Sequence, residues 1–207
     1  MRSILCYGDS NTWGYDPETG ERFGRDGRWP GVLRARVGAD VEVIEEGLSG
    51  RTSAYNDPLD SNLNGLTFFP VCLATHLPLD VVALFLGTND LFLPGGFTAQ
   101  FAAQGVGALV DVVARSTAGR DGDPPKCLVV VPPPFAPLGE LEPWSPHGVA
   151  ESERFSEAFQ RIAKEHPCRL LDLRGVVESS PVDGIHFDVP GHAAIGAAVA
   201  DALTELN

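Results

Sequence analysis

Short apolar runs alternate with helical patterns along the whole chain, and this alternation constrains the fold more than any other feature. The run at residues 81–86 is apolar throughout, which is typical of a strand buried on both faces of a sheet. A helical pattern between successive runs is what a parallel sheet needs for its crossover connections. The five runs span residues 2–8, 41–44, 81–86, 127–131 and 169–173. We therefore predict a three-layer, flavodoxin-like α/β domain with a five-stranded parallel sheet and helices on both faces.

The segments between the runs contain recognisable helix signals. Pro30 suits the first turn of a helix that Gly38 would end, and Thr98 is a suitable N-cap for a later one. Helices are predicted over residues 30–37, 69–76, 98–115, 149–165 and 190–206. Loops are predicted at residues 14–28, 54–68 and 133–148. No linker composition interrupts the chain, so we predict one domain over residues 1–207.

Composition excludes several classes of partner. The chain has 28 acidic and 15 basic residues, a net charge of −13, and no cluster of Lys and Arg. Nucleic acids and anionic membranes attract basic patches, so we expect neither as a partner. No apolar run approaches the length of a membrane span. The start of the chain lacks the apolar stretch of a signal peptide, and its four cysteines fit reduced core thiols, so we expect a cytoplasmic location.

We expect neither a cofactor nor a metal. No phosphate-binding glycine motif follows the first strand, which argues against a nucleotide site. Asp9 and Asp90 stand near the polar turns, but only one histidine lies nearby and no histidine pair has ligand spacing. The remaining histidines are interpreted as structural or solvated: His76, His147, His166 and His192.

Four polar, glycine-containing turns each follow a predicted strand. They read GDS after the first strand, GLSG after the second, GTND after the third and DGIH after the fifth. The carboxyl ends of parallel strands lie at one edge of the sheet, where open α/β sheets bind their ligands. Residues that are far apart in the sequence can therefore meet there.

These turns contain the groups that acyl transfer requires. The reaction needs a nucleophile, a base that takes its proton, and a group that orients the base. Ser10 offers the hydroxyl, while Asp183 and His186 can both be presented by one short turn. The chain order Ser, Asp, His is one of the orders in which this geometry occurs.

The same turns offer neutral donors for a developing oxyanion. The candidates are the backbone N–H groups of Ser10 and Gly50 and the side-chain amide of Asn89. Each turn alone has a simpler explanation: Asn89 could bond its own backbone, and Gly50 could serve only a turn with positive φ. Their joint occurrence, each after a strand, favours a serine hydrolase.

The four blocks resemble those of the SGNH, or GDSL-type, hydrolase superfamily. Further blocks are similar to its bacterial arylesterase and acyltransferase-like branch, notably GDSNTWG, RWPGVL, VIEEGLSGRTS and CLATHLPLD. The resemblance implies that Ser10 is the nucleophile, His186 the general base and then acid, and Asp183 its orienting group. It also implies an oxyanion hole formed by Ser10, Gly50 and Asn89.

One departure from the family pattern bears on substrate contacts. Asn11 stands where the short GDSL motif has leucine, outside the catalytic roles. Asn11, Trp13, Thr88 and Ile185 flank the catalytic positions, so they are our candidates for lining the acyl pocket. Core packing is an equally good explanation for the aromatic and aliphatic members.

The leading hypothesis is a serine esterase that hydrolyses short-chain or aryl esters, with acyl transfer or perhydrolysis if alcohol or peroxide replaces water. A carbohydrate O-acetyl esterase with the same triad is the second enzyme hypothesis. A non-catalytic, flavodoxin-like module that binds a small molecule is the alternative from another class. The residues leave the oligomeric state open; a homo-oligomer is compatible with them, and loop 54–68 is a candidate interface.

Overall fold

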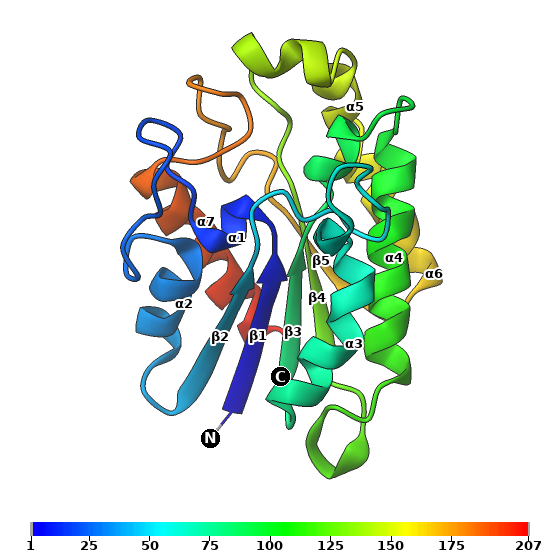
Figure 1. The fold of residues 1–207 in the computed structure, drawn as a ribbon. Helices are drawn as coiled ribbons and strands as arrows, with labels where there is room; N and C mark the ends of the chain where they lie inside the picture. Colours follow the sequence, from blue (N-terminus) through cyan, green and yellow to red (C-terminus); the bar gives the residue numbers. More distant parts are fainter. Residues whose placement is uncertain (1, 207) are drawn as a thin grey trace.

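The computed structural model describes residues 2–206 and contains one five-stranded parallel sheet with strand order β2-β1-β3-β4-β5 (Figure 1). The strands are β1 (Arg2–Gly8), β2 (Val41–Gly47), β3 (Val81–Phe85), β4 (Lys126–Val131) and β5 (Arg169–Asp172). All neighbouring strands pair in parallel, as predicted. The single domain predicted for residues 1–207 reaches one residue beyond the described part at each end and stays a prediction.

Helices cover both faces of the sheet, which gives the predicted three layers (Figure 1). One face carries α3 (Gly65–His76), α4 (Ala99–Arg115) and α6 (Phe155–Glu165); the other carries α2 (Trp29–Val37) and α7 (Val189–Thr204). The shorter elements are α1 (Ser10–Trp13), α5 (Gly148–Ser152), η1 (Ser61–Leu63), η2 (Asn89–Phe92), η3 (Arg120–Gly122) and η4 (Gly139–Trp144). Among the described residues, no helix has the length and apolar character needed to cross a bilayer.

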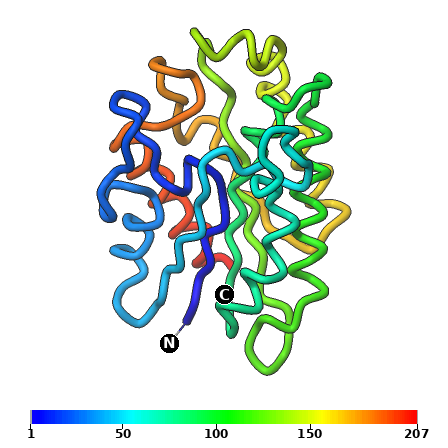
Figure 2. Tube along the Cα trace, in the orientation of Figure 1, coloured from blue at the N-terminus to red at the C-terminus, as the bar shows by residue number. Residues whose placement is uncertain are grey.

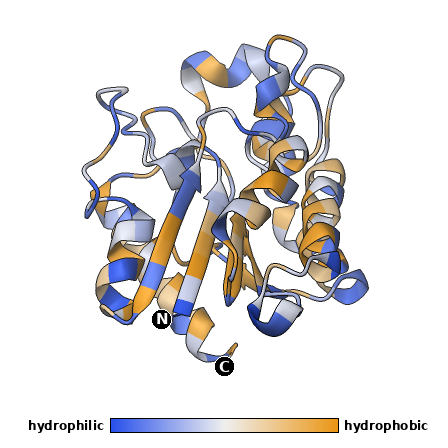
Figure 3. Cartoon of the chain, turned by 60° about the horizontal axis from the view of Figure 1, so that its bottom comes forward, coloured by the Kyte–Doolittle hydropathy of each residue, from blue (hydrophilic) through white to orange (hydrophobic). Residues whose placement is uncertain are grey.

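The alternation of side chains along β1 divides the core into two clusters. Leu5 and Tyr7 pack in the cluster under α3, α4 and α6, whereas Ile4 and Cys6 pack in the cluster under α2 and α7. Figure 3 shows the hydrophobic colour concentrated in the strands and the helices beside them. Because both faces of β1 are buried, its position in the sheet interior is fixed.

The boundaries of two helices differ from the predictions. The predicted helix 69–76 begins at Gly65, because the Asn64 side chain accepts the Thr67 N–H and caps a turn inside the polar stretch. The predicted helix 149–165 is two helices. The hydroxyl of Ser152 donates to the Val149 carbonyl and accepts the Phe135 N–H, each at 2.8 Å, so it competes with helix continuation at the break.

The predicted end of one strand needs correction. β2 continues to Gly47, three residues beyond the predicted end, and pairs with β1 up to Gly8. In α4, the Phe101 side chain is half exposed, and its ring contacts Phe97 and Tyr55.

The segment that follows β1 and the segment that precedes α7 meet at the carboxyl edge of the sheet. The dark-blue segment after β1 and the orange segment before α7 lie side by side in Figure 2. Two ring contacts confirm this: Tyr15 with His186 at 4.3 Å, and Phe23 with His192 at 5.4 Å between centroids. The polar turns after β1 and β5 are therefore brought together.

Candidate active site

Ser10 lies at the point where β1 becomes α1. Asp9 caps this short helix because its Oδ1 accepts the Asn11 N–H at 2.9 Å. Ser10 is the first residue of α1 and is 5% exposed. Its backbone N–H is among the first amides of the helix, which have no partner within it.

His186 joins Ser10 to Asp183. Its Nε2 lies 2.8 Å from Ser10 Oγ, and its Nδ1 lies 2.6 Å from Asp183 Oδ2. An ionised carboxylate can only accept, so Nδ1 carries the proton and Nε2 is left to accept the serine hydroxyl. The ring of Tyr15 lies against the imidazole, with centroids 4.3 Å apart. The three side chains are thus joined by hydrogen bonds in the Ser–His–Asp arrangement that serine hydrolases use.

The environment of Asp183 keeps this carboxyl ionised. Burial raises the pKa of Asp183, but the His186 side-chain hydrogen bond, the His186 charge and two backbone N–H groups lower the pKa by more. Those N–H groups belong to Ile185 and His186, and each lies 3.1 Å from Asp183 Oδ1. The pKa of Asp183 is therefore below the ordinary value for aspartate. The ionised carboxylate can accept the hydrogen bond from His186 Nδ1.

The two other predicted donors lie at the same cavity as Ser10. Gly50 stands in a turn with φ of +81°, a conformation that favours glycine. Asn89 Nδ2 donates one hydrogen to the Arg51 carbonyl at 3.1 Å, and its amide has a second hydrogen for a ligand. Ser10, Gly50 and Asn89 all line this cavity, which has a volume of about 610 Å³.

Arg51 fastens the turn after β2 to the ends of β1 and β2, a role that the sequence did not predict. Its buried guanidinium donates to the carbonyls of Gly8, at 2.8 Å, and Glu46, and it stacks 4.2 Å from the Tyr7 ring. The available signal was a lone Arg immediately after GLSG in an acidic segment.

Only one of the four candidate substrate contacts lines the cavity. Ile185 does so, whereas Asn11 is buried and donates to the Ile185 carbonyl at 3.2 Å. Trp13 carries the Arg22 guanidinium over its ring at 5.1 Å, and Thr88 is 2% exposed. Helical turns begin close to the ends of β1 and β3, at α1 and η2. They direct the side chains of Asn11, Trp13 and Thr88 into the protein or toward other loops.

Other side chains line the cavity instead. Those that the sequence did not identify include Tyr15, Phe92, Leu138, Leu141 and Trp144. Three of them lie in or next to η4, within the proline-rich loop 133–148. That loop therefore forms a wall of the cavity.

The remaining histidines have other surroundings. Burial lowers the pKa of His192 to about 4, and its Nδ1 accepts the Trp29 N–H at 3.3 Å. His166 pairs with Asp111 at 2.6 Å and His76 with Glu46 at 2.8 Å, both away from Ser10. His147 is exposed.

Asp9 and Asp90 are buried carboxyls beneath the site. Burial raises the pKa of Asp9 to about 6 and that of Asp90 to about 7. Ser53 donates to Asp90 through its backbone N–H, at 3.0 Å, and its hydroxyl, at 2.5 Å. Asp90 thus fastens the turn after β2 to the turn after β3.

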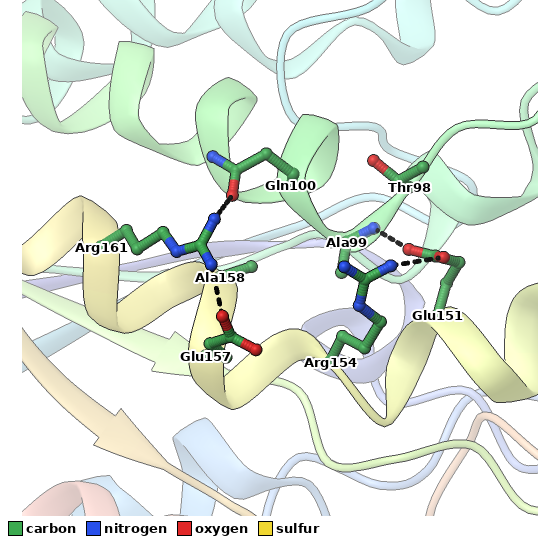
Figure 4. A pocket seen from close by; sticks show the side chains of 8 residues that line it. All are labelled: Thr98, Ala99, Gln100, Glu151, Arg154, Glu157, Ala158 and Arg161. Atoms are coloured by element: carbon green, nitrogen blue, oxygen red, sulfur yellow. Dashed lines mark hydrogen bonds and ion pairs between the residues drawn. The ribbon is translucent and has the colours of Figure 1, made fainter.

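A second hollow, of about 270 Å³, lies between the start of α4 and helices α5 and α6 (Figure 4). Its charges are mutually paired: Arg154 with Glu151 at 3.2 Å, and Arg161 with Glu157. Glu151 also accepts the Ala99 N–H at 2.8 Å. The residues lining it include no histidine or cysteine, so it lacks the base found beside Ser10.

The fold and the Ser–His–Asp geometry together define the class of α/β serine hydrolases. The GDSL-like lipase/acylhydrolase family model matches residues 6–194. The chain therefore belongs to the GDSL-like lipase/acylhydrolase family, and it is an ester-hydrolysing enzyme.

Solved structures agree with this assignment. The M. smegmatis aryl esterase is 41% identical, with a TM-score of 0.94 and full coverage of both chains. A carbohydrate acetylesterase from Sinorhizobium meliloti is 36% identical, also with a TM-score of 0.94 and full coverage of both chains. The Enterococcus faecalis lipase/acylhydrolase, at 21% identity and a TM-score of 0.70 over 100% of this chain and 97% of its own, shares the fold. A comparison with curated protein sequences found no match.

Proposed function

We propose that the protein is a serine esterase in which Ser10 is the nucleophile, His186 the general base and acid, and Asp183 the orienting group. The observation that carries this proposal is the unbroken relay from Ser10 Oγ to His186 to Asp183, at 2.8 and 2.6 Å. Ser10, at one end of this chain of hydrogen bonds, lines a cavity of about 610 Å³. This cavity leaves room for an ester beside the hydroxyl.

The reaction has two halves. Ser10 Oγ attacks the ester carbonyl carbon while His186 Nε2 takes the hydroxyl proton. The tetrahedral intermediate breaks its bond to the alcohol oxygen, which receives that proton and leaves. Water then attacks the acyl-serine, His186 takes a proton from it, and the carboxylic acid departs as Ser10 is regenerated.

The charge that develops on the carbonyl oxygen needs donors that are already in position. We assign this role to the Ser10 and Gly50 N–H groups and to the second hydrogen of Asn89 Nδ2. The Asn89 amide is held by its bond to the Arg51 carbonyl, so little reorganisation accompanies the reaction.

The cavity walls favour short-chain or aryl esters as substrates. Tyr15, Phe92, Leu138 and Ile185 present apolar surface close to the relay. The similarity to an aryl esterase supports the same substrate class. When an alcohol or peroxide takes the place of water in the second half-reaction, acyl transfer or perhydrolysis follows.

A carbohydrate O-acetyl esterase is the second candidate function. Trp144 lines the cavity and is 72% exposed, so a flat aromatic face is available to a sugar ring at the rim. Similarity to a carbohydrate acetylesterase supports this candidate. Rates on phenyl acetate and on acetylated xylose separate the two, and Trp144→Ala should impair only the sugar ester if that candidate is correct.

Replacement of Ser10 tests the proposal. Ser10→Ala should lower kcat for p-nitrophenyl acetate by at least about 10³-fold, because within residues 2–206 no other hydroxyl is hydrogen-bonded to His186. Ser49→Ala is the matched control: Ser49 lines the same cavity but is exposed, and its variant should retain most of the activity. A correctly folded Ser10→Ala protein with near-normal turnover would refute the mechanism.

Location and assembly stay predictions. The four cysteines, Cys6, Cys72, Cys127 and Cys168, are unpaired, and three are buried, which supports a reducing, cytoplasmic environment. Cell fractionation tests this location. The predicted absence of nucleic-acid partners and the question of a homo-oligomer are tested by gel-shift and light-scattering measurements.

A further inference from the structure

We propose that Glu46, Cys72 and His76 form a binding site for a thiophilic divalent transition-metal ion such as Zn²⁺. One ligand atom from each residue, an oxygen, a sulfur and a nitrogen, lies within 4.8 Å of the other two. The site is separate from the catalytic relay and shares none of its residues. The sequence predicted no metal site, because it contains no histidine pair at ligand spacing and these three residues lie outside the polar turns.

Local structure places the three ligands together. Cys72 and His76 are four residues apart in α3, so their side chains lie on the same face, one turn apart. Glu46 lies near the end of β2 and comes within 2.8 Å of His76 Nε2. A helix face and a strand end therefore supply the site.

The donor set selects the class of metal. A thiolate, an imidazole and a carboxylate match Zn²⁺ or Co²⁺, whereas Mg²⁺ and Ca²⁺ prefer all-oxygen ligands. In a tetrahedral zinc site, metal–ligand bonds of about 2.0–2.3 Å place ligand atoms about 3.3–3.8 Å apart. The three ligand atoms lie within 4.8 Å of one another, so the widest separation would have to close by up to about 1–1.5 Å, and the Glu46–His76 pair, now at 2.8 Å, would have to open slightly.

Solvent reaches the site from one side. The side chains of Glu46 and His76 are each 26% exposed, while Cys72 is buried. Glu46 also lines a cavity of about 620 Å³ beside α3 and loop 54–68. An ion can therefore enter from the cavity, and water can complete its coordination as the fourth ligand.

The charge of the ligand set suits a divalent ion. A Cys72 thiolate and the Glu46 carboxylate together carry two negative charges, which balance the charge of the metal.

Cobalt absorption provides the direct test on the full-length protein, after dialysis against a chelator. Co²⁺ should give a sulfur-to-cobalt charge-transfer band in the near ultraviolet with about one ion per chain. Zn²⁺ should abolish that band by competition. Cys72→Ala should remove the band, and His76→Gln and Glu46→Gln should each weaken binding by more than about tenfold.

His166→Gln is the matched control, because His166 and Asp111 form a histidine–carboxylate pair at 2.6 Å and neither is a member of the cluster. This variant should bind Co²⁺ as the wild type does. Absence of the band in folded wild-type protein would overturn the proposal. So would an unchanged affinity in folded His76→Gln protein, which would mean that Glu46 and His76 form only an ion pair.

Discussion

The imidazole of His186 is held on three sides, by Asp183 at Nδ1, by Ser10 at Nε2 and by the Tyr15 ring against its face. These contacts leave it one tautomer and little freedom to rotate. His192, only six positions later, is buried against the Trp29 N–H and cannot act as the base. Geometry at single residues therefore distinguishes one histidine from its neighbours.

Asn89 provides a test of the oxyanion hole at the scale of one side chain. Asn89→Ala should lower kcat by about 10²–10³-fold and change KM much less, because its hydrogen bond forms mainly with the transition state. Steady-state kinetics with p-nitrophenyl acetate measure both constants. An unchanged kcat would exclude Asn89 from the hole.

Asp90 should make stability depend on pH. Its pKa is about 7 in the folded protein, against an ordinary value of 3.8, so the folded state holds more protons between these two values. The free energy of unfolding should therefore fall as the pH rises from about 4 to about 7, by up to about 1.4 kcal/mol per pH unit for this group. Asp9, whose pKa is raised to about 6, contributes with the same sign.

Asp90→Asn should flatten this dependence, because the amide can still accept the Ser53 N–H but does not titrate. Urea unfolding at several pH values over that interval measures the slope. Equal slopes for the variant and the wild type would show that Asp90 does not carry the effect.

At the scale of elements, the site depends on turns that begin where strands end. The DGIH turn packs closely on the proline-rich loop, where a Cβ on Gly184 would lie 2.7 Å from the Ala136 carbonyl oxygen. Gly184 also has a φ of +84°. This close packing holds the turn that carries Asp183 and His186 against the loop.

Gly184→Ala should therefore cost both stability and activity, with a loss of about 2 kcal/mol or more from strain and steric clash combined. Gly175→Ala is the control: its φ is +80°, but no atom lies within 4 Å of its Cβ position. The control should show only the cost of positive φ, about 1 kcal/mol. Equal losses in thermal unfolding and in kcat would contradict the role of the contact.

Much of the element layout could be predicted from the sequence, and the failures have local causes. The five strands followed from short, mainly apolar runs, and Thr98 caps α4 as expected by accepting the Phe101 N–H. The predicted start of α3 was wrong because Asn64 caps the helix within a stretch whose composition is typical of a loop. The break between α5 and α6 depends on the Ser152 contact with Phe135, which no local pattern reveals.

At the scale of the whole molecule, the candidate site joins the beginning of the chain to its end. Ser10 and His186 are 176 positions apart, and parallel strand order alone brings their turns to one edge of the sheet. That convergence could be predicted because it follows from topology. The cavity walls could not, because Tyr15, Leu138 and Trp144 come from loops without periodicity.

Covalent labelling of Ser10 is the most direct test of the central claim that His186 activates this serine. A fluorophosphonate probe followed by peptide mass spectrometry should find one adduct per chain, on Ser10, and abolish ester hydrolysis in parallel. His186→Ala should slow labelling by at least about 10³-fold in folded protein. Labelling of another residue, or rapid labelling of Ser10 without His186, would contradict the account.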